Sequence, residues 1–407
     1  MIEREITSEL NTLLTEYPIV TVIGPRQAGK TTLVRHTLPE FNYVNLESPD
    51  TRAFAQEDPR AFLAEYTEPL ILDEIQRVPT LLSYLQERVD EKSGNGRFVI
   101  TGSHQLELRA AVTQSLAGRT AILTLYPLSI TELASTGIRW EHFDNYLLNG
   151  FLPRVHDKSQ RPAPAYSNYL QTYVERDVRQ LIRLKDVALF EKFLSLLAGR
   201  VGQLVNYSSL GNDIGVDDKT VKQWLSVLEA SFVIFRLQPY FENFGKRVMK
   251  SPKIYFTEPG LLTHLLGLER TDQIRRDPLI GGLFENLVIV EALKSRSNRG
   301  LKPELYFFRD HNGLEIDLLL RQGRDLTGVE IKSASTLHQK MRAGLLRFDK
   351  KVTPLAHKFL VYNSPSGDEA SRRWSDGVEA IGFRALGEKL EQKRLSTADR
   401  KGSIQSK

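Results

Sequence analysis

The chain has 407 residues, of which 41% are apolar and 26% charged, values ordinary for a soluble globular protein of two or three domains. It contains no cysteine, which excludes disulfide frameworks and thiolate metal sites. No apolar run is long enough to span a bilayer, and the first ten residues are charged, unlike a signal peptide. We therefore expect a cytoplasmic protein without a membrane partner.

Charge is distributed unevenly along the chain. The net charge is +5, but residues 1–150 carry 13 Lys and Arg against 20 Asp and Glu, whereas residues 151–407 carry 42 against 30. A basic later part is typical of a chain that meets a polyanion, so we expect DNA as a partner. The alternative is that these cations only solvate helix surfaces.

A phosphate-binding pattern lies near the N-terminus. The P-loop spacing is present over Gly24, Pro25, Arg26, Gln27, Ala28, Gly29, Lys30 and Thr31. A short β-branched strand is expected before it, at 19–23, and a helix after it, opening with Thr31 and Thr32. In that setting backbone N–H groups cradle phosphates. We expect residues 24–32 to bind ATP, with Lys30 along the β- and γ-phosphates and Thr31 as a ligand of Mg²⁺.

Two carboxylates follow a second apolar strand, which is expected over 69–76. The order Leu72-Asp73-Glu74 is the Walker B arrangement, in which Asp73 holds Mg²⁺ through water and Glu74 orients or deprotonates the attacking water. Burying two carboxylates at the end of an apolar strand costs free energy unless they coordinate a metal or contact polar groups. The alternative is a strand that simply reaches solvent.

Two further residues are predicted to act on the γ-phosphate. The strand expected at 97–103 ends in small polar residues, so we predict Ser103 as the sensor, with Thr101 as an alternative and His104 as a weaker one. Arg119, just before the strand expected at 120–125, is predicted to be an arginine finger, acting in its own chain or on a neighbouring subunit. Arg109 competes for this role, and a plain surface position for Arg119 is the alternative.

Strands alternate with helices over residues 1–130, which predicts an α/β fold with a parallel sheet covered on both faces. Ligands of such sheets bind beyond the carboxyl ends of the strands. We place this P-loop ATPase domain, with a helical connector, at residues 1–160.

Residues 161–270 are predicted to form a helical, winged-helix domain. A short helix at 207–214, a tight turn and a longer helix at 218–231 have helix-turn-helix spacing, and a hairpin at 232–239 and 253–257 follows. Lys219, Thr220, Lys222 and Gln223 would then face DNA. The alternative is a module that contacts another protein.

Residues 271–390 carry a second set of charged residues. Glu285 falls in a helix expected at 283–295, Asp317 on a strand, and Glu330 and Lys332 on one face of the next strand. Two carboxylates and a lysine that converge could hold Mg²⁺ and activate water for phosphodiester cleavage, although short patterns of this kind also occur by chance. Residues 391–407 are polar and charged and are expected to be a disordered tail.

These motifs together resemble a prokaryotic family of AAA-type ATPases with a C-terminal domain of uncharacterised function. The resemblance covers nearly the whole chain and is carried by GPRQxGKTT, LDEIQ, TGS, ERDVR (175–179), FEN (284–286), RDxxGxEID (309–317) and VEIK (329–332). It implies an ATP-hydrolysing core, a winged helix and a restriction-endonuclease-like α/β domain. His104 departs from the family pattern, in which a small polar residue follows the sensor serine.

Three functions follow from this sequence. The first is a DNA-acting ATPase that couples hydrolysis to rearrangement or translocation as a homo-oligomer, a hexameric ring being one form. The second is an ATP-gated, Mg²⁺-dependent nuclease. The third is a nucleotide-dependent protein-interaction switch.

Overall fold

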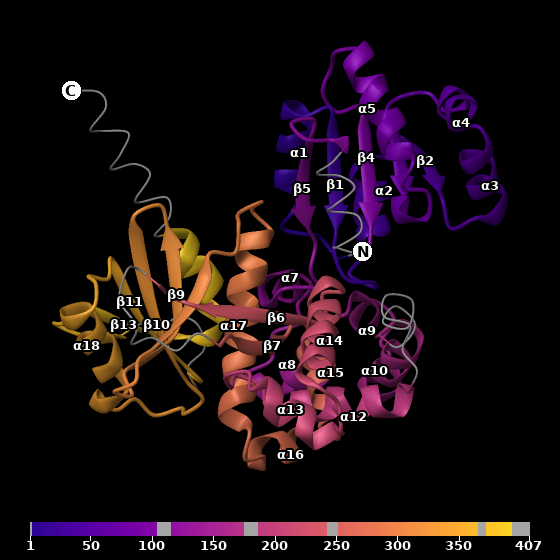
Figure 1. Ribbon diagram of the computed structural model, residues 1–407. Coiled ribbons are helices and arrows are strands. Elements are labelled where there is room, and N and C mark those ends of the chain that lie inside the picture. Colours follow the sequence, from indigo (N-terminus) through magenta and orange to yellow (C-terminus); the bar gives the residue numbers. More distant parts are fainter. Residues whose placement is uncertain (1, 104–114, 175–185, 242–250, 365–371, 393–407) are drawn as a thin grey trace, which may run out of the picture.

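The computed structural model describes residues 2–103, 115–174, 186–241, 251–364 and 372–392, which form two sheets joined by helices (Figure 1). Some predicted features lie outside the described residues. They are His104, Arg109, the segment 175–179 and the expected tail from residue 393 onward.

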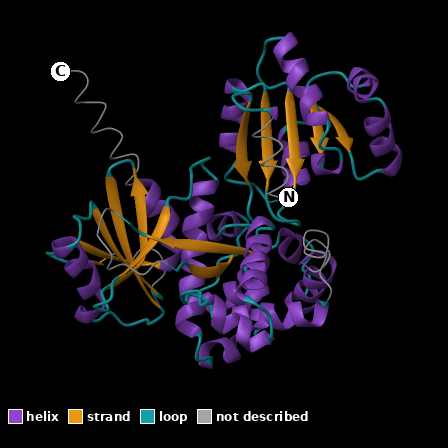
Figure 2. Cartoon of the chain, viewed as in Figure 1, coloured by secondary structure: helices purple, strands orange, loops and turns teal. Residues whose placement is uncertain are grey.

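The first part of the chain is a parallel sheet with helices on both faces (Figures 1 and 2). Its strands stand in the order β2-β3-β4-β1-β5, with bounds β1 Ile19–Ile23, β2 Asn42–Asn45, β3 Leu70–Asp73, β4 Phe98–Gly102 and β5 Thr120–Thr124. The helices are α1 (Thr7–Glu16), α2 (Lys30–Thr37), α3 (Pro49–Glu57), α4 (Pro59–Glu65), η1 (Ile75–Arg77) and α5 (Leu81–Glu91). Val20 and Val22 share a core with α1 and α2, whereas Ile19 and Ile23 share one with α4 and α5. The predicted α/β sheet is confirmed.

The carboxyl ends of these strands lie at one edge of the sheet. Ile23 at the end of β1 is level with Gly102 of β4, and Asn45 of β2 is level with Asp73 of β3. Gly24, Glu74 and Ser103 each follow directly on one of these strand ends. The parallel pairing therefore brings the predicted P-loop, Walker B and sensor residues to the same edge.

A helical region follows. Its elements are α7 (Ile130–Ser135), α8 (Phe143–Asn149), α9 (Pro153–Asp157), α10 (Pro162–Tyr169), η2 (Leu170–Val174), α12 (Val187–Ala198), α13 (Tyr207–Ile214), α14 (Asp218–Ala230), α15 (Pro259–Leu265) and α16 (Thr271–Arg276). The caps of α13 and α14 are Asn206 and Asp217, whose side chains accept hydrogen bonds from backbone N–H groups of the first turn. Gly215 ends α13 at a φ of 79°, which suits glycine. The two helices and the turn expected at 207–231 are therefore present.

The last part is an eight-stranded mixed sheet in the order β12-β13-β11-β10-β9-β8-β6-β7. Its strands are β6 (Ile234–Pro239), β7 (Lys253–Phe256), β8 (Leu305–Arg309), β9 (Glu315–Gln322), β10 (Asp325–Lys332), β11 (His357–Tyr362), β12 (Arg372–Arg373) and β13 (Val378–Gly382). Its helices are α17 (Ile280–Ser297), η4 (Gln339–Arg342), α18 (Ala343–Lys351) and η5 (Phe383–Ala385). The β6–β7 hairpin is not a free wing, because β6 also pairs with β8, Gln238 lying beside Tyr306. The hairpin expected in a separate domain thus belongs to the C-terminal sheet.

Helix α17 is buried along most of its length and lies between the C-terminal sheet and the central helices (Figure 1). It also contacts the segment that leaves the first sheet. The Nζ of Lys294 donates to the Leu128 carbonyl at 2.7 Å and to Glu291 Oε1 at 2.9 Å, and Glu291 Oε2 accepts from the Ile130 N–H. Although α17 is largely apolar, neither it nor any other described helix is long and apolar enough to cross a membrane.

Candidate active site

The P-loop joins β1 to α2 and folds around its lysine. The Nζ of Lys30 donates to the carbonyls of Gly24 and Pro25, each at 2.9 Å. Gly24 is required because a Cβ there would lie 2.0 Å from the Leu125 carbonyl oxygen. Gly29, at a φ of 93°, starts α2 so that its first N–H groups face the loop. The local geometry is that of an anion cradle with a cation at its centre.

Thr31 and Asp73 meet across the gap between α2 and β3. The Thr31 hydroxyl donates to Asp73 Oδ2 at 2.8 Å, and Asp73 is nearly buried. Tyr43 donates to the same carboxylate oxygen at 2.7 Å and Thr101 donates to the other one. Burial and the neighbouring Asp73 carboxylate raise the pKa of Tyr43, so the phenol stays a donor. A hydroxyl and a carboxylate side by side are the hard oxygen ligands that Mg²⁺ takes at a nucleotide site, where phosphates complete its shell.

Glu74 is held by polar neighbours beside this pair. It adopts a left-handed backbone conformation, at φ 60° and ψ 46°, which is uncommon for a non-glycine residue and concentrates at functional sites. Gln76 Nε2 donates to Glu74 Oε2 and, at 3.1 Å, to Ser103 Oγ, and Ser103 in turn lies 3.3 Å from Glu74 Oε2. The predicted sensor serine and the predicted base are therefore neighbours. The role of Gln76 in holding Glu74 was not predicted, although a polar side chain two residues after Glu74 indicates that it could contact that carboxylate.

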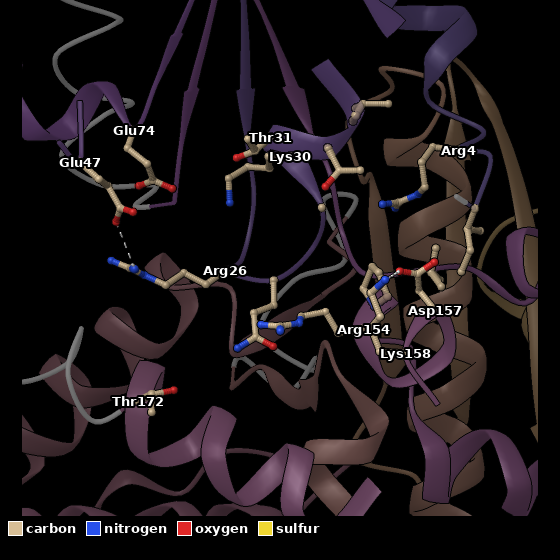
Figure 3. Close-up of a pocket in the computed structure, with 17 residues that line it drawn as sticks. Arg4, Arg26, Lys30, Thr31, Glu47, Glu74, Arg154, Asp157, Lys158 and Thr172 are labelled. Atoms are coloured by element: carbon tan, nitrogen blue, oxygen red, sulfur yellow. Dashed lines mark ion pairs between the residues drawn. The ribbon is translucent and has the colours of Figure 1, made fainter. Parts of the chain in front are cut away.

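Lys30, Thr31 and Glu74 line a pocket of about 750 Å³ (Figure 3). From the predicted loop, Arg26, Gln27, Gly29, Lys30, Thr31 and Thr32 line it. The other three, Gly24, Pro25 and Ala28, offer carbonyls to Lys30 and Arg4. Figure 3 shows Glu47 and Glu74 on one side of Lys30 and Asp157 with Lys158 on the other.

The helical region supplies part of the pocket wall that the sequence did not predict. Pro153 and Arg154 of α9, Lys158 just after it and Thr172 of η2 all line the pocket. They add Arg154 and the Lys158–Asp157 ion pair to the wall of a pocket that is otherwise built on the first sheet. No local pattern in the sequence relates them to the P-loop.

Arg4 lines the pocket and holds the P-loop backbone in position. Its guanidinium donates to the carbonyls of Ala28 and Tyr126, both at 2.7 Å, and to Glu132 Oε1 at 2.9 Å. The side chain is buried, so the loop backbone is tied to the N-terminal segment and to α7. Arg4 therefore positions the P-loop, and this role also went unpredicted.

The prediction that Arg119 acts in its own nucleotide site is wrong. Arg119 directly precedes β5, and its carbonyl accepts from the N–H of Ile19 at the start of β1. It thus lies at the amino edge of the sheet, opposite the P-loop, where it pairs with Asp90 on the surface. Parallel strands put residues before and after a strand at opposite edges, which is the physical reason. Action on a neighbouring subunit stays a prediction.

A second charged site lies in the C-terminal sheet, where all four predicted residues are neighbours. Lys332 Nζ is 2.7 Å from Glu330 Oε1 and 3.6 Å from Asp317 Oδ2, and Asp317 also accepts from the Ile331 N–H. Glu285 of α17 is connected to them through Lys253. The Nζ of Lys253 is 3.1 Å from Glu285 and 2.8 Å from Glu315, which lies on β9 two residues before Asp317. We call Lys253, Glu285, Glu315, Asp317, Glu330 and Lys332 the acid–lysine cluster. Lys253 and Glu315 were not predicted as members.

Burial dominates the electrostatics of the acid–lysine cluster. It raises the pKa of Glu330 to about 8, with Asp317 adding to the rise and Lys332 opposing it. Burial also raises the pKa of Glu285, which Lys253 opposes and Asp317 reinforces. Glu330 Oε2 is buried and has no hydrogen-bond partner within the described part of the chain. Among the described residues, however, no three His, Asp or Glu side chains converge as a metal-ligand set.

Three segments of the chain match protein families. Residues 16–134 match an AAA domain, whereas residues 140–272 and 280–386 match two domains of unknown function, DUF8612 and DUF4143. The winged-helix and endonuclease-like folds therefore stay predictions. Among solved structures, the Walker-type ATPase paby2304 of Pyrococcus abyssi is similar at 15% identity and a TM-score of 0.44, covering 65% of this chain and 96% of that one. DnaA from Aquifex aeolicus bound to AMPPCP is similar at 14% identity and a TM-score of 0.29, covering 55% and 85%.

Two curated relatives match much of the chain. The uncharacterized proteins Rv2008c of Mycobacterium tuberculosis and Mb2031c of Mycobacterium bovis are each 33% identical over 368 residues, covering 88% of this chain and 81% of the relative. An uncharacterized protein of Haemophilus influenzae is 25% identical over 255 residues, covering 59% of this chain and 60% of the relative. The chain belongs to the family of these mycobacterial proteins, and its first third is an AAA-type P-loop ATPase domain.

Proposed function

We propose that this protein hydrolyses ATP and uses the resulting conformational change to act on DNA. The observation that carries the proposal is that Lys30, Thr31 and Glu74 line one pocket and that the Thr31 hydroxyl donates to Asp73. An AAA domain implies nucleotide binding with Mg²⁺, and the donor set at Thr31 and Asp73 fits that ion.

Each residue has a role that follows from its position. The P-loop N–H groups and the start of α2 hold the phosphates, and Lys30 stabilises charge on the β- and γ-phosphates. Thr31 and Asp73 would hold Mg²⁺, which neutralises phosphate charge when bound. Glu74 orients the attacking water and accepts its proton, while Gln76 and Ser103 keep the carboxylate in place.

The pocket couples nucleotide state to the rest of the chain. Its walls come from the first sheet and from α9, so a bound triphosphate contacts both parts. Hydrolysis removes the γ-phosphoryl group and with it the contacts that this group would make with the pocket. The conformational equilibrium between the first sheet and α9 would then shift. The net positive charge of residues 151–407 supports DNA as the molecule acted upon, and assembly into a homo-oligomer would let one subunit's Arg119 reach another's pocket.

Phosphate release measured with and without DNA tests the proposal. We expect duplex or single-stranded DNA to stimulate ATP hydrolysis by the full chain several-fold at low salt, because DNA binding biases the arrangement that hydrolysis needs. If no nucleic acid binds or changes the rate, the DNA part of the proposal is refuted. Slow hydrolysis together with a large size difference between the ADP and ATP forms would instead favour a protein-interaction switch.

The acid–lysine cluster supports a second candidate function, an ATP-gated nuclease. Asp317 and Glu330 offer hard oxygen ligands that fit Mg²⁺, and the partnerless Glu330 Oε2 is the position left for a cation. Lys332 would stabilise the charge that develops on a phosphodiester as water attacks it. Lys253 already neutralises Glu285 and Glu315, which leaves the other two carboxylates for the ion.

A cleavage assay on duplex, single-stranded and branched DNA with Mg²⁺ or Mn²⁺ tests this function. We expect cutting that Lys332→Ala lowers by about a hundredfold or more. Lys358→Ala is the matched control: Lys358 lies on β11 of the same sheet, pairs with Asp349 of α18 and is not part of the acid–lysine cluster, so its loss should leave cutting unchanged. Equal cutting by the Lys332 variant, or no cutting by the wild type with any metal and nucleotide, would rule the nuclease out.

A further inference from the structure

We infer that the DNA backbone binds on helix α18 and strand β12 of the C-terminal sheet, and not on α14, which has the position of a recognition helix. The inference rests on the proposed action on DNA. The surface is made of exposed cations, which we call the basic face: Lys340, Arg347, Lys350, Lys351, Arg372 and Arg373.

One side of α18 supplies half of the basic face. Leu345 and Phe348 of this helix are buried in the core of the C-terminal sheet, so Arg347, Lys350 and Lys351 lie on its outer side. No residue of the basic face forms an ion pair with another described residue. Such cations are available for phosphates, and each phosphate contact releases counterions from the nucleic acid.

Trp374 contacts arginines from two separate segments of the chain. The guanidinium carbons of Arg342 and Arg372 lie 4.8 and 5.4 Å from the centre of the Trp374 ring. Arg342 also pairs with Asp376 in the turn between β12 and β13. The short helix η4, which carries Lys340 and leads directly into α18, therefore lies beside β12, and we take the cations of η4, α18 and β12 as one surface.

Helix α18, which carries half of the basic face, also contacts the acid–lysine cluster through its first turn. A Cβ at Gly344 would lie 3.4 Å from Glu330 Oε2 and 3.1 Å from the Glu315 carbonyl oxygen, so the helix backbone packs directly against the cluster. Half of the basic face therefore lies on a helix that contacts the cluster.

Charge argues against α14 as the main contact. Residues 206–226 hold Asp213, Asp217 and Asp218 against Lys219 and Lys222, whereas residues 338–351 hold five Lys and Arg against one Asp. Asp217 caps the start of α14, and its hydrogen bonds with Thr220 lower the pKa of its carboxyl. A carboxylate at that point repels phosphate, so α14 would gain little from a polyanion.

Fluorescence anisotropy of labelled duplex DNA, titrated with the full chain at several salt concentrations, tests the inference. The variant Arg347→Glu/Lys351→Glu is compared with Lys219→Glu/Lys222→Glu, which reverses two exposed cations on α14. We expect the α18 variant to bind about tenfold or more weakly and to lower the salt slope by about 2, because two phosphate contacts are lost. The α14 variant should bind within about twofold of wild type. Thermal melting by circular dichroism verifies that both variants are folded.

The possible outcomes separate this inference from the proposed function. Loss of binding in the α14 variant alone would overturn the basic face and keep DNA as partner. Absence of DNA binding by the wild type would overturn both proposals. Binding of the wild type to phosphatidylserine vesicles and not to DNA, lost in the α18 variant, would make the basic face a membrane contact and overturn its assignment to nucleic acid.

Discussion

Replacing Lys30 with alanine is expected to lower ATP turnover by about 10²–10³-fold, the loss seen when one preorganised donor to a developing anion is removed. The Nζ of Lys30 lies inside the P-loop, bonded to the Gly24 and Pro25 carbonyls, and no other described lysine occupies the loop. The variant should lose affinity as well as rate, because the same ammonium would contact the phosphates of bound ATP in the proposed site. Phosphate release and binding of a fluorescent ATP analogue measure the two effects.

Glu74→Gln is compared with the Lys30 variant, because it should affect hydrolysis without affecting nucleotide binding. It keeps the size and the contact with Gln76 but removes the carboxylate that accepts a proton, so hydrolysis should fall by about 10²–10⁴-fold while nucleotide binding is kept. Retention of turnover in both variants would show that the pocket in Figure 3 is not where ATP is hydrolysed.

Replacing Lys294 with methionine is expected to destabilise the protein by about 3–5 kcal/mol, because it breaks a buried ion pair on one side only. Lys294 is 0% exposed and bonds to Glu291 and to the Leu128 carbonyl, and its ammonium lies 3.6 Å from the centre of the Phe151 ring. Without Lys294 the Glu291 carboxyl stays buried, and burial already raises its pKa. Thermal unfolding followed by circular dichroism and by a probe on the first sheet measures the loss.

Two controls separate the buried pair from a general effect of removing a cation. Lys294→Met combined with Glu291→Leu should recover part of the lost stability, since the carboxyl without a partner is removed too. Arg60→Met breaks the exposed Arg60–Glu87 pair and should leave the unfolding temperature close to that of the wild type, because solvent screens an exposed pair. A Lys294 variant as stable as the Arg60 variant would mean that α17 does not hold the segment leaving the first sheet.

The nucleotide half of the site was predictable because its signals are local. A β-branched strand, a glycine loop and a helix start within residues 19–31 already specify a phosphate cradle. Asp73 and Glu74 close an apolar strand, and the rule that parallel strands end at one edge puts them beside Lys30. The same polarity rule could have excluded Arg119 from its own pocket, since that residue precedes its strand.

The acid–lysine cluster was partly predictable for a similar reason. Glu330 and Lys332 share a face because they are two residues apart on β10, and the neighbouring strand β9 brings Asp317 beside them. Glu315 carries the same signal, because it lies on β9 two residues before Asp317. Lys253 had no such signal in the sequence. It lies on β7, which is far from β9 and β10 along the chain and is separated from them in the sheet by β8 and β6.

Residue spacing along the chain therefore determined which side chains share a strand end or a strand face, since those relations follow from backbone periodicity alone. Only the packing of distant segments decided that α9 closes the nucleotide pocket and that β6 joins the hairpin to the C-terminal sheet. It also decided that Lys294 of α17 reaches the Leu128 carbonyl. These contacts arise from burying apolar faces of helices and sheets against one another, and many chain paths satisfy the same local pattern.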